Sequence, residues 1–174
     1  DYKESFCNYL FYQPKELWQY EAALFCCDRN EIKAYMLRRL KPGLGGGKTI
    51  FVTVDEVASA HIKEMAAVYP VLNADKAKDA DMRFCRFIEG VFDKRIVSSV
   101  FLTGEGFENN WYPTSLRVLC NGRRAFIGNN LYSKGACYTA YRKMFMHIED
   151  PVYLSEDKLT DQITVNMRVN GQEM

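Results

Sequence analysis

Hydrophobic and polar residues alternate in three stretches near the start of the chain, which is the pattern of half-buried strands. Residues 20–28 and 32–39 are joined by a polar turn, Asp28-Arg-Asn-Glu31, and predict a β-hairpin. A glycine-rich loop then leads to a third strand over residues 49–54. The sequence therefore predicts a three-stranded antiparallel meander.

After the third strand the apolar spacing changes to that of helices. Asp55 is suited to cap a helix over residues 56–69. His61 is expected on one face of that helix. Residues 73–79 are polar, as in a linker, and an amphipathic helix is predicted from Asp81 onward.

An apolar strand over residues 98–103 ends in a glycine turn. Its run Val100-Phe-Leu102 suits burial on both faces. Gly104 and Gly106 then indicate a turn that needs positive φ or close backbone approach. Open α/β sheets bind ligands beyond the carboxyl ends of such strands. The remaining core elements are predicted as a short helix, a strand and a final helix, at residues 111–119, 123–127 and 131–145.

The order of elements is three strands, helix, strand, helix, strand, helix, and it predicts an α/β fold. Strand–helix–strand crossovers make parallel neighbours. We therefore expect a mixed sheet, with the antiparallel meander on one side, parallel strands on the other and helices on both faces. A leading helix within residues 1–17 precedes the core at 18–146, and residues 147–174 form an extension with a further strand at 161–170. Because the chain starts at Asp1 and ends partway through a strand pattern, we expect a piece of a longer protein.

Composition and charge narrow the classes of partner. The 174 residues are 48% hydrophobic and can bury a substantial core. The 23 basic and 22 acidic residues give a formal net charge of +1, so there is no electrostatic reason to expect nucleic acid or an acidic membrane as a partner. The pairs Arg38-Arg39 and Arg123-Arg124 are interpreted as solvated strand ends. No apolar run is long enough to span a membrane, and no leader is recognised.

The cysteines and histidines do not form a metal-binding pattern. None of the six cysteines lies in a C-x-x-C pair, and the two histidines stand apart, whereas zinc sites need closely paired ligands. Neighbouring Cys26 and Cys27 would point to opposite faces of a strand. We therefore expect no metal, and reduced, mostly buried thiols in a cytoplasmic protein.

Two segments resemble parts of a known superfamily. Val100-Phe-Leu-Thr-Gly104 looks like the strand and glycine turn that face the adenosine of bound ATP, and Asn130–Ala140, with its Lys-Gly-Ala run, looks like the helix that closes the same lobe. Over residues 18–146 the chain thus resembles the second lobe of the actin, Hsp70 and sugar-kinase superfamily, whose core is a ribonuclease H-like sheet. In that lobe the small-residue run lets the helix approach the sheet. The chain also resembles an uncharacterised bacterial family in which Leu-Thr-Gly-Glu-Gly-Phe and Asn-Leu-Tyr-x-Lys-Gly-Ala recur.

The resemblance implies nucleotide contacts from the first hairpin turn, the glycine turn and the start of the last helix. These candidates are Asp28, Arg29, Asn30, Gly104, Glu105, Gly106, Lys134 and Gly135. In the superfamily, the amides of glycines in the first hairpin turn hold the phosphates. Here the turn has no glycine, and the side chains of Arg29 and Asn30 add bulk at that place. Glu105 stands where a second glycine is usual, and a carboxylate disfavours a phosphate neighbour.

The run Gly43-Leu-Gly-Gly-Gly-Lys-Thr49 is similar to a phosphate-binding loop but fails on spacing and context. Pro42 stands where the first glycine of that motif belongs. A strand follows the run where the motif requires a helix. We interpret this run as a flexible hairpin loop.

Asp28 and Glu105 each follow a core strand. If the first and fourth strands are parallel neighbours, both carboxylates lie at one end of the sheet, where they suit Mg²⁺ or a catalytic pair. The alternative is a solvated turn residue and a helix-capping residue. The aromatic residues near the glycine turn indicate either packing of the loop onto the sheet or a surface for a protein partner. They are Phe107, Trp111, Tyr112 and Tyr132.

Two functional hypotheses follow. The first is a degenerate actin-like lobe that acts as a scaffold or protein-interaction module in a larger bacterial protein, motivated by the missing phosphate-binding glycines and the absent partner lobe. The second is a genuine ATP-binding lobe of an actin-like or Hsp70-like ATPase whose other lobe is missing from this chain. No cofactor is expected under the first, and ATP with Mg²⁺ under the second. The partner is a protein or the other lobe, and enzymatic activity stays open.

Overall fold

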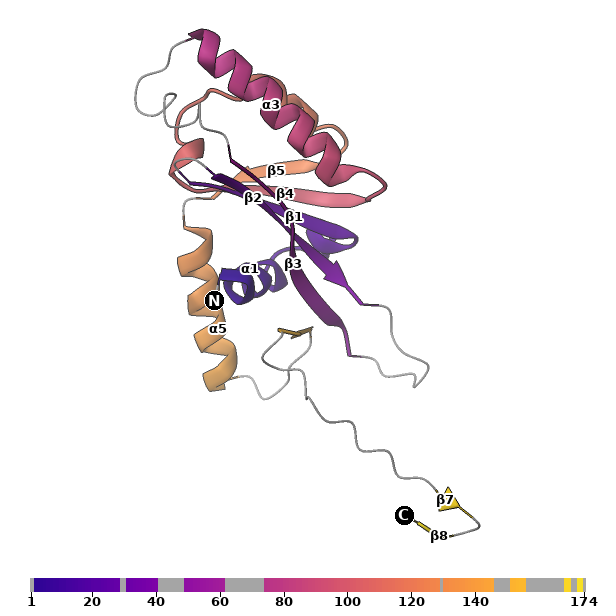
Figure 1. Cartoon of the computed structure of the whole chain (residues 1–174). Coiled ribbons are helices and arrows are strands. Elements are labelled where there is room, and N and C mark those ends of the chain that lie inside the picture. The colour runs from indigo at the N-terminus through magenta and orange to yellow at the C-terminus, as the bar shows by residue number, and fades with distance from the viewer. Residues whose placement is uncertain are drawn as a thin grey trace.

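A computed structural model places most of the chain around one mixed β-sheet with helices on both faces (Figure 1). The structure describes residues 2–28, 31–40, 49–61, 74–128, 130–145, 151–155, 168–169 and 172–173. The strands of the sheet follow the order β5-β4-β1-β2-β3-β6. Their bounds are β1 (Glu21–Cys27), β2 (Glu31–Arg39), β3 (Phe51–His61), β4 (Val97–Thr103), β5 (Arg124–Ile127) and β6 (Val152–Tyr153). The helices are α1 (Tyr2–Phe11), η1 (Lys15–Trp18), α3 (Ala74–Phe92), η2 (Glu105–Phe107), α4 (Pro113–Leu119) and α5 (Leu131–Phe145).

Strands β1, β2 and β3 form the antiparallel meander that the alternating pattern predicts. Strand β4 pairs in parallel with β1, and β5 pairs in parallel with β4, which confirms a mixed sheet with parallel strands beside the meander. The short β6 extends the sheet in parallel beyond β3. Strands β7 (Arg168–Val169) and β8 (Gln172–Glu173) form a separate antiparallel pair.

Alternate residues of the central strands enter two separate cores. Because successive strand residues point to opposite faces, Phe25 packs against Phe84 of α3 on one side, while Leu24 joins Phe6 of α1 on the other. All four side chains are at most 2% exposed. In Figure 1, α3 lies above the sheet, and α1 and α5 lie below it. The sheet is therefore the middle layer of three.

Strand β3 is longer than the sequence pattern predicts, and the helix expected over residues 56–69 is wrong where the structure describes it. Residues 56–61 continue β3 and pair with β2, so His61 ends a strand and does not lie on a helix. Backbone hydrogen bonds to a neighbouring strand outweigh a local capping signal such as Asp55. The remainder of the expected helix, residues 62–69, lies outside the described residues.

Helix α3 begins at Ala74, so residues 74–79 of the linker expected over 73–79 are instead the first turns of a helix, and residue 73 lies outside the described residues. The first buried residue of α3 is Ala80. A solvated helical turn and a linker have the same polar composition, and packing of the later turns on the sheet decides between them. The strand expected over residues 161–170 falls mostly outside the described residues, which include only 168–169 of that range.

The parallel pairing of β1 and β4 gives the sheet two chemically distinct ends. Cys26 lies opposite Thr103, so the turn after β4 follows beside the turn after β1. We call this the carboxyl end of the sheet. At the opposite end Glu21 lies beside Val97, where both strands begin, and we call this the amino end.

Candidate functional site

A pocket of about 470 Å³ lies at the carboxyl end of the sheet. Its walls come from β1, β2, the turn after β4, α1 and α5. The side chains that give it chemical character are tyrosines, carboxylates and one lysine. They are Tyr2, Tyr35, Tyr132, Asp28, Glu105, Glu108 and Lys33. The volume lies in the range of small-ligand sites.

Three candidates from the sequence, Asp28, Gly104 and Glu105, line this pocket together. The parallel pairing of β1 and β4 therefore brings the two carboxylates to one end of the sheet, as expected. Among the described residues, no group of three or more histidine, cysteine, aspartate or glutamate side chains is arranged to hold a metal ion.

The two glycines of the turn face the protein's own β1 strand. Gly104 has a φ of +103°, and a Cβ atom there would collide with the carbonyl oxygen of Cys27. A Cβ atom at Gly106 would collide with Sγ of the same cysteine. The turn needs glycines because it packs directly on the end of β1. The side of each glycine that would carry a side chain thus faces Cys27 and not the pocket.

The aromatic residues after the turn hold it against the sheet. Nε1 of Trp111 donates a hydrogen bond to the carbonyl of Gly106 at 2.7 Å. The hydroxyl of Tyr112 donates to the carbonyl of Phe107 at 3.1 Å. These three rings are each 3% exposed, so they pack the loop onto the core. The packing interpretation is confirmed for them, whereas Tyr132 lines the pocket.

Tyr132 and Cys26 form a neutral, hydrogen-bonded pair in the pocket wall. Burial raises the pKa of Tyr132 far above its ordinary value, and the neighbouring Cys26 adds to that shift. Burial likewise raises the pKa of Cys26, followed by the charge of Asp28. The thiol is therefore protonated at neutral pH and is not an activated nucleophile.

The other candidates from the sequence lie elsewhere. Gly135 packs against the carbonyl of Ser5, so the small residue lets α5 approach α1. This corrects the expectation that it brings the helix close to the sheet. Lys134 is exposed on α5 and is not among the residues that line the pocket. Arg29 and Asn30 lie outside the described residues.

Sequence reasoning missed several residues of the pocket. Lys33 and Tyr35 alternate along β2 with buried residues. The two-residue period of a strand was therefore the signal that could have placed both side chains on the same face. Lys33 forms an ion pair with Glu31 at 3.2 Å. Tyr2 reaches the pocket from α1, where its ring lies 4.7 Å from that of Tyr132. No local signal identifies Tyr2, because its place depends on the packing of two helices far apart in sequence.

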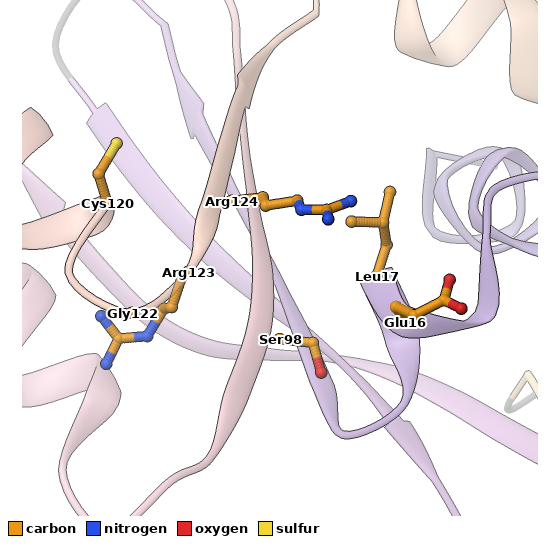
Figure 2. A pocket seen from close by; sticks show the side chains of 7 residues that line it. All are labelled: Glu16, Leu17, Ser98, Cys120, Gly122, Arg123 and Arg124. Carbon is orange, nitrogen blue, oxygen red and sulfur yellow. The ribbon is translucent and has the colours of Figure 1, made fainter.

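A second hollow, of about 350 Å³, lies at the amino end of the sheet. Figure 2 shows Arg124 extending toward Leu17, whereas Arg123 points the other way. Arg123 lies 4.3 Å from the ring centre of Phe92 and donates a hydrogen bond to the carbonyl of Val118. Burial lowers the pKa of Arg123. Arg123 therefore supports the core, and Arg124 is the arginine that extends into this hollow.

Together, the fold and the pocket define an α/β protein with a mixed sheet and a ligand-sized hollow where its parallel strands end. Residues 1–156 match a family model described as "Family of unknown function (DUF5716) C-terminal", and the chain belongs to this family. No curated protein matches the sequence. In the described part of the chain, every helix is too short or too polar to cross a membrane.

Proposed function

We propose that the chain is a ribonuclease H-like lobe, similar to the second lobe of actin-like ATPases, which acts as a protein-interaction module. The strand order supports this reading, because an antiparallel meander continues into parallel β4 and β5 with helices on both faces. The likeness of β4 and its glycine turn to that lobe adds to it. The proposal assigns the carboxyl-end pocket no role in ATP turnover.

The observation that carries the proposal is the charge of this pocket. Its described lining holds three carboxylates, from Asp28, Glu105 and Glu108, against a single lysine, Lys33. A triphosphate placed there would meet net like charge at short range. Gly106 does not line the pocket, because its turn packs on the end of β1. A pocket of this composition has lost the features that hold nucleotide phosphates.

The alternative is a genuine ATP-binding lobe that works with a second lobe. Its support is the position of the pocket beyond the carboxyl ends of β1 and β4, where open α/β sheets bind ligands. In that case Asp28 and Glu105 would act through a Mg²⁺ ion that offsets their charge. The partner lobe would supply the remaining phosphate contacts.

An amide-resolved NMR titration of this chain with Mg-ATP distinguishes the two. The interaction-module proposal expects a folded spectrum with no shifts at Asp28, Gly104 or Glu105 up to several millimolar ATP. Progressive shifts at these amides would overturn it and support the alternative. Such shifts should then weaken in Lys33→Gln, which removes the only lysine of the described lining. The exposed Lys78→Gln on α3 is the matched control.

A further inference from the structure

Two basic pairs that are distant in the sequence meet at the amino end of the sheet. Arg38-Arg39 end β2, and Lys94-Arg95 lead into β4. Both pairs line a hollow of about 420 Å³, with Glu21 of β1 between them. Because β1 lies between β2 and β4 in the sheet, its first residue reaches both neighbours. The sequence suggested only that Arg38-Arg39 are a solvated strand end, and it gave no sign that a second basic pair lies beside them.

Contacts within the protein hold the guanidinium groups of this hollow in place. Nε of Arg38 lies 3.1 Å from Oε1 of Glu21, and Nη1 of Arg95 lies 3.6 Å from Oε2. The two arginine side chains remain 35% and 28% exposed. Arg39 lies 5.7 Å from the ring centre of Trp18. A ligand would meet arginines that are already ordered, which reduces the entropy lost on binding.

The hollow concentrates positive charge in a nearly neutral chain. Four basic residues and one carboxylate line it, whereas the whole sequence has a formal charge of +1. Lys94 adds a charge outside the ion pairs that Arg38 and Arg95 make with Glu21. It lies in the turn between α3 and β4 with a φ of +56°. Large side chains at its border are exposed, namely Tyr20 at 54%, Leu40 at 43% and Ile96 at 68%.

We propose that this hollow binds a phosphate monoester dianion on a peptide of a partner protein. Several ordered arginines and a lysine suit a dianion, because guanidinium groups bind phosphate oxygens through paired hydrogen bonds. The exposed apolar border suits the side chains that flank a phosphorylated residue. A hollow bordered by exposed apolar side chains such as Leu40 and Ile96 favours a peptide over a nucleic acid backbone, which needs a basic track. The statement that the phosphate is carried by a peptide rests on the proposed role as a protein-interaction module. The statement that the hollow binds an anion does not depend on that role.

The hollow shown in Figure 2 also lies at the amino end of the sheet. The amide of Tyr20 donates a hydrogen bond to Oγ of Ser98 at 2.9 Å, and these two residues belong to the neighbouring hollows. Arg124 lines the second hollow from β5. Acidic residues that flank the phosphate in an extended peptide would face Arg124.

The test is an NMR titration of this chain with the peptide Ala-Leu-phosphoserine-Leu-Ala, blocked at both ends. We expect shifts at the amides of Tyr20 and Ile96, and none with the unphosphorylated peptide. Lys94→Gln should weaken binding about tenfold, the effect of losing one charge-assisted contact. It leaves both ion pairs of Glu21 in place, so the fold is retained. Arg117→Gln, an exposed arginine on α4, is the charge-matched control and should bind unchanged.

Four outcomes would overturn the inference. They are no shift at Tyr20 or Ile96 at millimolar phosphopeptide, equal binding of a glutamate-substituted peptide, equal binding of inorganic phosphate, and tighter binding of a uridine oligonucleotide. Equal binding of inorganic phosphate would mean that the ligand is a free anion. Tighter binding of the oligonucleotide would mean that it is a nucleic acid. These results are separable from the ATP titration, which reports on Gly104 and Glu105 at the other end of the sheet.

Discussion

The carboxylate of Asp81 accepts hydrogen bonds from both the backbone amide and the hydroxyl of Ser115, at 2.8 and 2.6 Å. It also accepts one from the amide of Thr114 at 2.8 Å. Asp81 belongs to α3 and is 3% exposed. It therefore satisfies the first amides of α4 from a different helix, in the way that a capping side chain does.

Asp81→Ala should lower the free energy of unfolding by about 2 to 3 kcal/mol. The substitution leaves the amides of Thr114 and Ser115 without a buried acceptor. Urea unfolding measures the effect. Asp79→Ala is the matched control, because Asp79 makes an exposed ion pair with Arg83 and should lose less than about 1 kcal/mol. Equal losses in the two variants would contradict the capping role.

Stability should also fall at acid pH through Asp81. Burial acts to raise the pKa of Asp81, but hydrogen bonds from Ser115 and Thr114 outweigh it and lower that pKa from 3.8. The folded state then binds this proton less readily than the unfolded state, so the stabilisation is present above about pH 4 and is lost as the pH falls through the folded value. The wild-type chain should therefore lose more stability on acidification than Asp81→Asn, as measured by urea unfolding at several pH values. Parallel pH profiles would show that Asp81 does not titrate in this way.

Gly106→Ala should destabilise the chain by about 2 kcal/mol or more, because the new methyl group overlaps Sγ of Cys27. The double variant with Cys27→Ala removes that overlap and should cost less than the sum of the two single changes. Gly90→Ala on α3 is the control. It has open space around it and should be neutral or stabilising by up to about 1 kcal/mol. Strict additivity in the double variant would mean that Cys27 does not set the requirement for glycine.

Gly135→Ala should separate α5 from α1, since its methyl group would overlap the carbonyl of Ser5. Backbone cannot move aside as a flexible side chain does, so we expect a loss of about 2 kcal/mol or more. Hydrogen exchange should speed up along α1. A sensitive local reporter is the hydrogen bond from Asn8 to Oγ1 of Thr139, at 2.9 Å. Unchanged exchange in α1 would argue against close contact at this position.

The chain should also lose stability at alkaline pH through Cys27. Burial, followed by the charges of Cys26 and Asp28, raises the pKa of Cys27 from 9.0 to about 12. The folded state keeps this proton more tightly, so the stabilisation is complete below about pH 9 and is lost as the pH rises toward 12. Thermal unfolding between these limits should show a shallower decline in Cys27→Ala than in the wild-type chain. Cys137→Ala, at an exposed position, should follow the wild-type profile.

Local sequence signals predicted most of the elements of this fold. The two-residue alternation of Ile32, Ala34 and Met36 identified β2, and all three side chains are fully buried. The apolar run before Gly104 identified β4 as a strand buried on both faces. These predictions succeeded because burial on one side of a regular element leaves a periodic trace in the sequence. The expectation that Asp28 and Glu105 lie at one end of the sheet had a different source, because the resemblance to the second lobe implied that β1 and β4 are parallel neighbours.

Local signals failed where long-range pairing or packing decided the outcome. Residues 56–61 became strand because β2 offered them hydrogen-bond partners. Residues 74–79 became helix because the later turns of α3 pack on the sheet. The capping of α4 by Asp81 was not predicted, because Asp81 and Ser115 are more than thirty residues apart in the sequence. In each case the competing element is distant in the sequence and leaves no trace in the local pattern.

The sequence by itself determined most of the elements, the mixed character of the sheet and the near-neutral total charge. Only the tertiary structure decided how that charge is distributed. Strand order and register carry Arg38 and Arg95 to Glu21 at the amino end, and carry Asp28 and Glu105 to the pocket at the carboxyl end. In the local sequence, each of these residues is only a charged residue near the end of a strand. Adjacency in the sheet makes them sites, because electrostatic interactions depend on distance in space and not on separation along the chain.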